Sequence, residues 1–352
     1  MERPTDPAGE AELATWLGEL GADAAQIEEG LRSGRADALA GDVVLERGAT
    51  LSARDVAERT GIGADRVQSM YRELGVPTPD PDAPQFTEAD VMLIDRLVGA
   101  RRQGIVQGTD LLRVIAGAME RIAEAAVAIY VQGPEETLRQ RGSSVLECAR
   151  SNAGATELAL DVGTGLAPLF RHHMRQAVAR QRVIQEGVSR RELARLAIGF
   201  VDLVGSTELQ GRLDTRALGD QVSRFEARAF DVTAAGGGRL VKFIGDEIMI
   251  AVPDAVAGCR IVCDLVDAFT DDGTQPRAGL VYGEVLFRHG DYYGPVVNLA
   301  ARLVDAAIPG EALVDESVVV AAKEEDLAFE AAGRRMLKGF SAPVSVWSLA
   351  IG

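Results

Sequence analysis

The chain is 352 residues long, carries a net charge of −16 and is 47% apolar, a composition that suits an acidic folded protein with two domains. Both halves of the sequence are acidic, which excludes the basic surface that non-specific nucleic-acid binding requires. The N-terminus has no basic start followed by an apolar core, and charged residues interrupt the apolar stretch at 114–131. With three cysteines that show no metal-ligand spacing, these features predict a cytoplasmic protein with reduced thiols and no transmembrane segment.

Residues 1–190 are predicted to form an all-α domain. Apolar residues recur at helical spacing in 91–98, 111–125 and 166–184. Four prolines between Val76 and Pro84 form an extended hinge that no helix can cross. The last of the helical runs leads toward a short link at 186–192, where we place the domain boundary.

Ahead of the hinge, residues 51–74 have the pattern of a helix-turn-helix. Ser52 is a suitable N-cap for the first helix, Gly61 suits the turn, and a second helix is expected at 64–74. The segment is similar to the start of MerR-type regulators. It holds as many acidic as basic residues, however, which argues against DNA binding and favours a helical packing unit.

Residues 191–352 change to alternating strands and helices. Strands are expected at 196–201, 240–244, 248–252, 278–282 and 284–287, and helices at 215–234, 255–269 and 296–305. Because 242–252 has the pattern of a hairpin, the predicted α/β (α+β) domain has a mixed sheet.

Two carboxylates follow strand-like runs in this second domain. Asp202 ends the run 196–201 and precedes a small-residue turn, 205–207, that can point backbone N–H groups at an anion. Asp246 lies in the turn of the predicted hairpin. If their strands are neighbours, the two side chains meet at one end of the sheet, and hard oxygen ligands beside a phosphate suit Mg²⁺ or Mn²⁺.

Three segments, 200–207, 241–247 and 291–302, resemble class III adenylate cyclases and occur in that family's order. The resemblance covers about 194–349 and implies a ferredoxin-like catalytic domain that makes cyclic AMP from ATP. It implies that Asp202, Asp246 and the carbonyl of Leu203 bind two Mg²⁺ or Mn²⁺ ions. By the same resemblance, Lys242 and Asp291 bind the adenine ring, and Asn298 and Arg302 act on the ribose and the transition state. The residues expected to contact the phosphates are Gly205, Ser206, Thr207, Arg277 and Lys338. Ser206 and Thr207 depart from the aromatic residue and threonine that many relatives have.

The residue types suit this reaction. Asn298 and Arg302 are four positions apart, so on a helix they share one face and can reach the same ligand. Lys242 can donate to the N1 acceptor of adenine, and Asp291 can accept from its N6 amino group. Guanine presents the reverse pattern, so the pair favours ATP over GTP.

The resemblance also implies how the chain assembles. Catalytic domains of this family pair head to tail, and each site takes its metal-binding aspartates from one chain. The adenine pair, Asn298 and Arg302 come from the other chain. Since this sequence carries both sets, a homodimer through the catalytic domain with two equivalent sites is expected.

The layout is similar to actinobacterial cyclases with an N-terminal regulatory domain, which can inhibit and can respond to pH or fatty acids. His172 and His173 lie on the helix that leads toward the catalytic domain, and histidine changes charge near neutral pH. We hypothesise that they form a pH-sensitive switch, against the alternative of two surface histidines. A fatty-acid pocket among the apolar helices of 91–130 is a second hypothesis.

Two other functions are compatible with parts of the sequence. The first is a DNA-binding transcription regulator whose cyclase-like domain senses a nucleotide, and the complete set of catalytic residues argues against it. The second is a diguanylate cyclase, because 245–247 match part of that family's hairpin signature. Ile244 and Ile248 depart from that signature, and Lys242 with Asp291 would have no role in it.

Overall fold

A computed structural model describes residues 7–77, 80–104, 110–185, 193–204, 215–270, 275–323 and 327–350. The chain divides into two compact units, 1–172 and 173–352. The division falls inside helix α9, so this helix belongs to both units. The link expected at 186–192 and the phosphate turn expected at 205–207 lie outside the described residues. Within the described ranges, no helix is long and apolar enough to cross a membrane.

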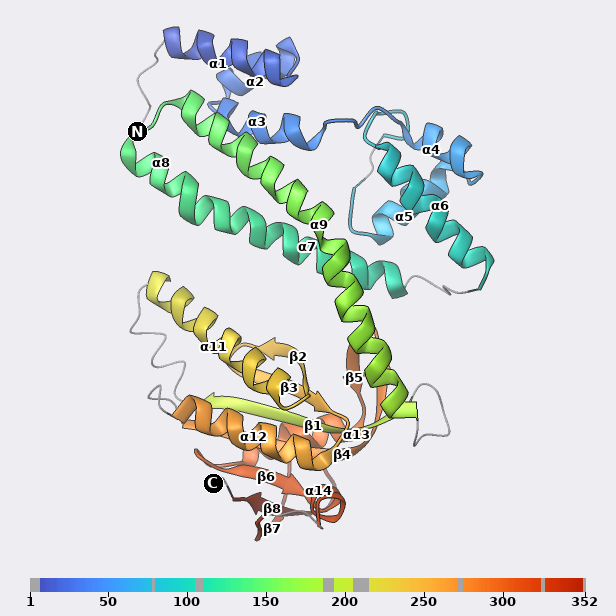
Figure 1. The fold of residues 1–352 in the computed structure, drawn as a ribbon, viewed down its shortest axis with the longest axis vertical. Helices are drawn as coiled ribbons and strands as arrows, with labels where there is room; N and C mark the ends of the chain where they lie inside the picture. Colours follow the sequence, from blue (N-terminus) through green and yellow to red (C-terminus); the bar gives the residue numbers. More distant parts are fainter. Residues whose placement is uncertain are drawn as a thin grey trace. The chain divides into compact units, whose positions relative to one another are not determined.

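Helices are the regular elements of the described part of the N-terminal unit, as predicted (Figure 1), and one isolated β-bridge joins Leu51 to Phe86. One π-helical turn, η1, connects α7 to α8 and contains Pro134. The elements are α1 (Pro7–Leu20), α2 (Ala24–Arg32), α3 (Ala36–Leu45), α4 (Ala53–Thr60), α5 (Ala64–Glu73), α6 (Glu88–Arg102), α7 (Asp110–Tyr130), η1 (Val131–Glu135), α8 (Glu136–Arg141) and α9 (Val145–Gln185).

Helices α4 and α5 are the predicted helix-turn-helix. Ser52 caps α4 through a reciprocal capping box with Asp55, and Gly61 ends α4 in the left-handed conformation at φ 68°. Tyr71 of α5 packs edge-on against Phe86, with ring centroids 4.8 Å apart, and its hydroxyl donates to Asp90 of α6. Burial raises the pKa of Tyr71. These contacts join α4, α5 and α6 around one apolar cluster.

A second cluster in this unit joins α1, α2 and α3 to the beginning of α9. Leu13, Leu17, Val44 and Ala149 are among its buried members. Full burial of a leucine stabilises a fold by about 1.5–3 kcal/mol, so this cluster is what attaches the first turns of α9 to the helical unit.

The C-terminal unit is built on one mixed sheet with the strand order β2-β3-β1-β4-β6-β8-β7, and β5 pairs with β4 outside this path. The β4–β6 pair is parallel and the other pairs are antiparallel. The predicted hairpin is confirmed as β2 and β3. The elements are β1 (Leu193–Val204), α11 (Thr215–Ala235), β2 (Arg239–Ile244), β3 (Glu247–Val252), α12 (Ala255–Thr270), β4 (Gln275–Arg288), β5 (Asp291–Tyr293), α13 (Pro295–Ala306), β6 (Ala312–Asp315), α14 (Glu316–Ala321), β7 (Phe329–Arg335) and β8 (Val344–Leu349).

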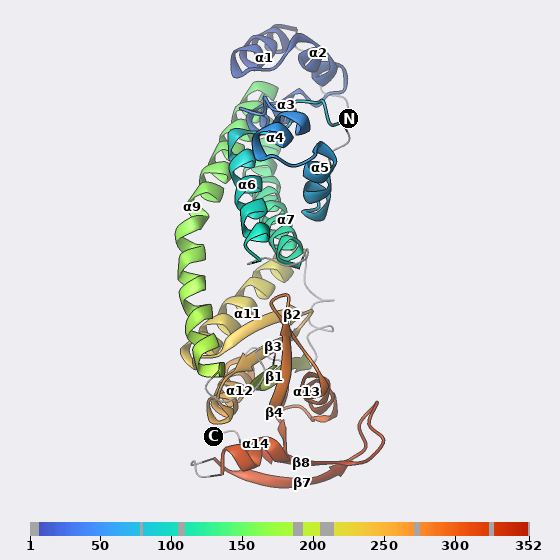
Figure 2. The ribbon, with the colours of Figure 1, turned by 90° about the vertical axis from the view of Figure 1, so that its right-hand side faces the viewer.

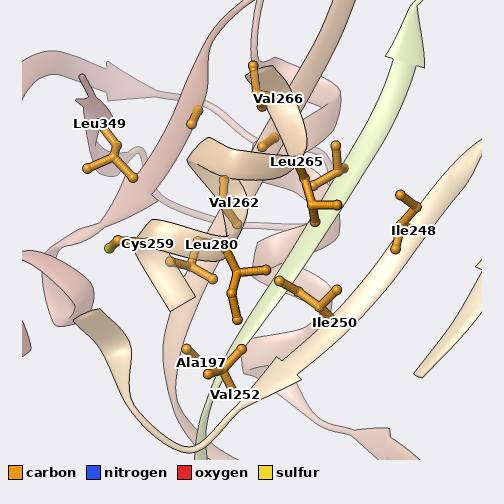
Figure 3. Close-up of a cluster of buried hydrophobic side chains, with 14 of the residues drawn as sticks. Ala197, Ile248, Ile250, Val252, Cys259, Val262, Leu265, Val266, Leu280 and Leu349 are labelled. Atoms are coloured by element: carbon orange, nitrogen blue, oxygen red, sulfur yellow. The ribbon is translucent and has the colours of Figure 1, made fainter. Parts of the chain in front are cut away.

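Both faces of the central strands are buried. Along β1, Ala197 and Val201 belong to one apolar cluster, whereas Ile198 and Phe200 belong to another, as the two-residue period of a strand requires. Helix α12 packs on the first face, where Figure 3 shows its side chains against β1, β3 and β4. Helix α13 packs on the second face, on the opposite side of the sheet (Figure 2). Two-sided burial explains why β1 is an almost continuous apolar run.

Two elements differ most in extent from the predictions. The strands expected at 278–282 and 284–287 are one continuous strand, β4, because Gly283 marks a close packing contact instead of a turn. A Cβ at Gly283 would lie 2.8 Å from Cγ2 of Val296 on α13. The helix expected at 166–184 begins much earlier, at Val145, and spans 41 residues.

Candidate active site

The two carboxylates predicted to meet do lie on neighbouring strands. In the β1–β3 pair, Asp202 stands opposite Glu247, and Asp246 precedes Glu247 in the β2–β3 turn. Gly245 begins that turn with φ 66°, a conformation that glycine adopts without strain. The antiparallel register therefore gathers three acidic residues at one end of the sheet.

Arg277, near the beginning of β4, is paired with Asp202. Its Nε and Nη2 donate to Oδ2 of Asp202 at 2.8 and 2.7 Å. Its Nη1 donates to the carbonyls of Asp305 and Ala307, at the end of α13. The last carbonyls of a helix attract cations, so α13 holds the guanidinium in place against the carboxylate. In this state the charge of Asp202 is balanced within the chain.

Glu247 was not among the predicted site residues, yet it lies inside this group. Burial is the main cause that raises the pKa of Glu247 to about 7. The negative charges of Asp202, Asp305 and Asp246 raise it further, and Arg277 lowers it. The end of the sheet therefore carries an excess of negative charge that Arg277 only partly offsets.

The oxygen atoms at this end of the sheet fit a magnesium or manganese ion whose coordination is completed by the phosphates of a bound nucleotide. Among the described residues, no three His, Cys, Asp or Glu side chains form a ready-made metal cluster. Mg²⁺ commonly needs only one or two carboxylates, with water and substrate phosphates supplying the remaining oxygens. Asp202 and Asp246, with the Leu203 carbonyl, offer hard oxygen donors of that kind, and a cation there would relieve the crowding around Glu247.

The predicted adenine pair is in direct contact. Lys242 on β2 places its Nζ 2.5 Å from Oδ2 of Asp291, the first residue of β5. The other oxygen of Asp291 accepts from the backbone N–H of Tyr292 at 2.8 Å. Both side chains are partly exposed, at 41% for Lys242 and 24% for Asp291, so a planar ring could approach them from solvent.

Helix α13 carries the predicted amide and guanidinium on its outer side. Ala300, Leu303 and Val304 are buried in the sheet-facing cluster, whereas Asn298 is exposed and Arg302 is half-exposed. The sequence spacing of four residues thus puts both polar groups on the face away from the core.

The position of α13 is set by a close contact with β4. A Cβ at Gly279 would lie 2.5 Å from both the Ala300 carbonyl oxygen and the Val304 nitrogen. Only glycine therefore permits this approach. On the outer side of α13, Arg302 Nη1 donates to Oδ2 of Asp305 at 2.7 Å, which forms an ion pair that was not predicted.

The remaining predicted residues are exposed or lie outside the described residues. Lys338 is exposed in the turn between β7 and β8, and His172 and His173 are exposed on α9. Gly205, Ser206 and Thr207 lie outside the described residues. Glu247 and Asp305 were not predicted as residues of the site. Glu247 directly follows Asp246, and Asp305 lies three residues after Arg302 on the same helix, so their positions in the sequence could have indicated them.

Comparisons with known proteins identify the family of the chain. A family model described as the adenylate cyclase regulatory domain matches residues 5–181. An uncharacterized protein of Mycobacterium tuberculosis is 36% identical over 354 residues, covering 98% of this chain and 91% of that protein. An adenylate cyclase of Glutamicibacter nicotianae is 33% identical over 290 residues, covering 74% of this chain and 69% of that protein. A pH-sensitive adenylate cyclase of M. tuberculosis is 29% identical over 330 residues, covering 88% of this chain and 80% of that protein.

The chain belongs to the class III adenylate cyclases of actinobacteria that carry this N-terminal regulatory domain. The resemblance drawn from the three sequence segments is thereby confirmed, together with the fold class. This membership excludes the diguanylate cyclase alternative.

Proposed function

We propose that the chain converts ATP to 3′,5′-cyclic AMP and pyrophosphate at two equivalent sites, each shared between the catalytic domains of a homodimer. Each site takes Asp202, Asp246 and Arg277 from one protomer. Lys242, Asp291, Asn298 and Arg302 come from its partner.

The observation that carries this proposal is that the predicted metal-binding and adenine-binding residues lie at opposite ends of β4. Arg277, which is ion-paired with Asp202, lies near the beginning of this 14-residue strand. Asp291, with its partner Lys242, follows its end. A second copy arranged head to tail would bring the carboxylate end of one chain to the adenine pair of the other, which supports a site that no single chain completes.

The chain's own residues then have separate tasks. Lys242 donates to adenine N1 and Asp291 accepts from N6, so the ring is oriented and guanine is disfavoured. Asn298 positions the ribose, and the Arg302 guanidinium donates to the α-phosphoryl oxygens where negative charge accumulates. Before ATP binds, Arg302 is paired with Asp305 and Lys242 with Asp291. Substrate must therefore replace or share these ion pairs.

Asp202 and Asp246, with the Leu203 carbonyl, would hold the two divalent ions that the family resemblance implies. Bound there, such ions make the 3′-hydroxyl more acidic and neutralise the triphosphate. Arg277 and Lys338 would contact the phosphates, and residues 205–207 would cradle them. Arg277 already lies beside Asp202. It could therefore contact a phosphate of the bound triphosphate while its Nη1 keeps its hydrogen bonds to the carbonyls of Asp305 and Ala307 at the end of α13.

We further propose that the N-terminal unit restrains the catalytic unit and responds to a signal. A relative that shares most of this chain is named a pH-sensitive adenylate cyclase. His172 and His173 are exposed on α9, the helix shared by both units. Activity across mildly acidic to mildly basic pH should differ between the wild type and a His172→Ala/His173→Ala double variant. Identical profiles would remove these histidines from regulation. A fatty-acid ligand is tested by adding oleate to the same assay.

The direct test of the activity incubates the purified full chain with ATP or GTP and with Mg²⁺ or Mn²⁺, and identifies the products by chromatography. Cyclic AMP and pyrophosphate should form from ATP in a metal-dependent way. The absence of cyclic AMP under every metal condition, with a folded dimeric chain, would contradict the proposal.

A further inference from the structure

Arg239, at the beginning of β2, makes four contacts with the β4–β5 hairpin. Its Nη2 donates to the Gly290 carbonyl at 2.6 Å, and its Nη1 donates to the Tyr292 hydroxyl at 3.3 Å. Its guanidinium also lies over two rings, 5.8 Å from the centroid of Phe287 and 5.5 Å from that of Tyr292. One side chain therefore holds residues on both sides of the hairpin turn.

The turn that Arg239 holds is the one that presents Asp291. Arg288 pairs with Asp291, and the two residues between them, His289 and Gly290, both have positive φ, at 55° and 81°. Two-residue hairpins of this type need left-handed backbone at both positions, which a residue other than glycine adopts less readily. A contact to the Gly290 carbonyl acts at the centre of this turn, one residue from Asp291.

A bulge in β2 explains how Arg239 and Lys242 reach the same hairpin. Residues three apart on a regular strand point to opposite faces. The register of β2 against β3 shifts between Leu240 and Lys242, which adds one residue to β2. The extra residue restores a common side for Arg239 and Lys242. Arg239 then contacts Gly290 and Tyr292, and Lys242 contacts Asp291 between them.

We propose that Arg239 is a positioning residue for nucleotide selection: it fixes the β4–β5 turn so that Asp291 stands at the right distance from Lys242 to read adenine. This inference rests on the proposed function, in which Lys242 and Asp291 bind the base. Arg239 does not touch the nucleotide in this scheme. It acts by holding one of two groups whose spacing must match N1 and N6 of a rigid ring, and small displacements of such groups weaken selection strongly.

The test compares Arg239→Met with Arg195→Met. Arg195, on β1, also lies over an aromatic ring, 5.2 Å from the centroid of Tyr282, but Tyr282 precedes the residues 286–288 of β4 that pair with β5 and lead into the turn before Asp291. For Arg239→Met, the KM for ATP should rise by about 3- to 10-fold with kcat much less changed, and the preference for ATP over GTP should fall by a similar factor. Arg195→Met should keep the wild-type KM and preference. Arg239→Lys keeps the charge without the planar guanidinium, so its KM for ATP and its preference for ATP should lie between those of the wild type and those of Arg239→Met.

Two further measurements separate positioning from general stability. Amide hydrogen exchange should accelerate at 287–293 in Arg239→Met and stay unchanged elsewhere in the catalytic unit. In an Asp291→Asn background, adding Arg239→Met should cause no further loss of ATP preference, since the effect passes through Asp291. An unchanged ATP-to-GTP ratio in Arg239→Met, or an equal additional loss in the Asp291→Asn background, would overturn the proposal.

Failure of the proposed function would be visible separately. If the wild type made no cyclic AMP, the activity itself would be refuted. Displacement of a fluorescent ATP analogue from the full chain by ATP and by GTP would still measure base selection. A wild type that selects ATP, beside an Arg239→Met variant that selects it equally well, would refute the positioning role alone.

Discussion

Arg277 donates two hydrogen bonds to the same oxygen of Asp202, at 2.8 and 2.7 Å, while its third nitrogen is held by the last carbonyls of α13. The two side chains are only 26% and 19% exposed. A carboxylate that is expected to bind a cation is thus already neutralised by a fixed arginine. If Asp202 holds a divalent ion and Arg277 contacts a phosphate, as proposed, each group would exchange the other for a new partner of opposite charge, and neither charge would be left uncompensated.

Asp202→Asn tests this arrangement. The amide keeps the volume but removes the negative charge, so cyclase activity should fall by on the order of 100-fold or more. Arg277 keeps its carbonyl contacts, and the chain should remain folded with a loss of about 1–3 kcal/mol in the free energy of unfolding. Cyclic AMP formation and thermal unfolding measure the two effects. Asp267→Asn, on the exposed side of α12, should change neither.

Lys242→Glu tests the adenine pair. The variant places a second carboxylate beside Asp291 and removes the donor to N1, so kcat/KM with ATP should fall about 100-fold and the relative use of GTP should rise. Steady-state kinetics with both nucleotides measure it. The exposed Lys323 provides a matched control, and Lys323→Glu should behave as the wild type. Equal losses for ATP and GTP in Lys242→Glu would argue against base reading by this residue.

Gly279→Ala tests how α13 is positioned. The new methyl group would lie 2.5 Å from the backbone of Ala300 and Val304, so the helix must move outward. The expected loss of stability is about 1–3 kcal/mol. Cyclase activity of the folded fraction should also fall, because Asn298 and Arg302 move with the helix. Gly219→Ala on α11 has nothing within 4 Å of the added Cβ and should be neutral or stabilise by up to about 1 kcal/mol. A fully active Gly279→Ala variant would contradict this packing.

The cysteines give a test of pH-dependent reactivity. Burial raises the pKa of Cys259 to about 12 and that of Cys263 to about 11. Since the thiolate is the nucleophile, these groups should stay protonated and nearly inert to alkylation up to pH 9, about 100-fold or more slower than a free thiol. Mass spectrometry should find Cys148, Cys259 and Cys263 labelled rapidly only in denaturant. Fast labelling of Cys259 in the native chain would disprove its burial.

Much of the catalytic unit could be predicted from the sequence because its signals are local. The apolar run of β1 ends at Asp202, the β2–β3 hairpin is short, and the four-residue spacing of Asn298 and Arg302 suits one helix face. These patterns are confirmed as elements, whereas the roles of the residues remain proposals.

The parts that the sequence did not predict depend on contacts between distant segments. A glycine between two apolar runs favours a break between strands, but Gly283 instead lets the side chain of Val296 on α13 pack closely against β4. The contribution of Arg239 depends on a bulge in β2 and on a turn about 50 residues later. The charge group around Glu247 depends on the antiparallel register that places it opposite Asp202.

The central claim is that two chains share each catalytic site, and subunit complementation tests it most directly. Asp202→Ala and Arg302→Ala chains should each be inactive as homodimers. When they are mixed and allowed to exchange subunits, half of the dimers are mixed and each has one intact site, so activity should return to about a quarter of the wild-type value. A mixture that stays as inactive as its parents, while size-exclusion chromatography shows mixed dimers, would contradict the shared site.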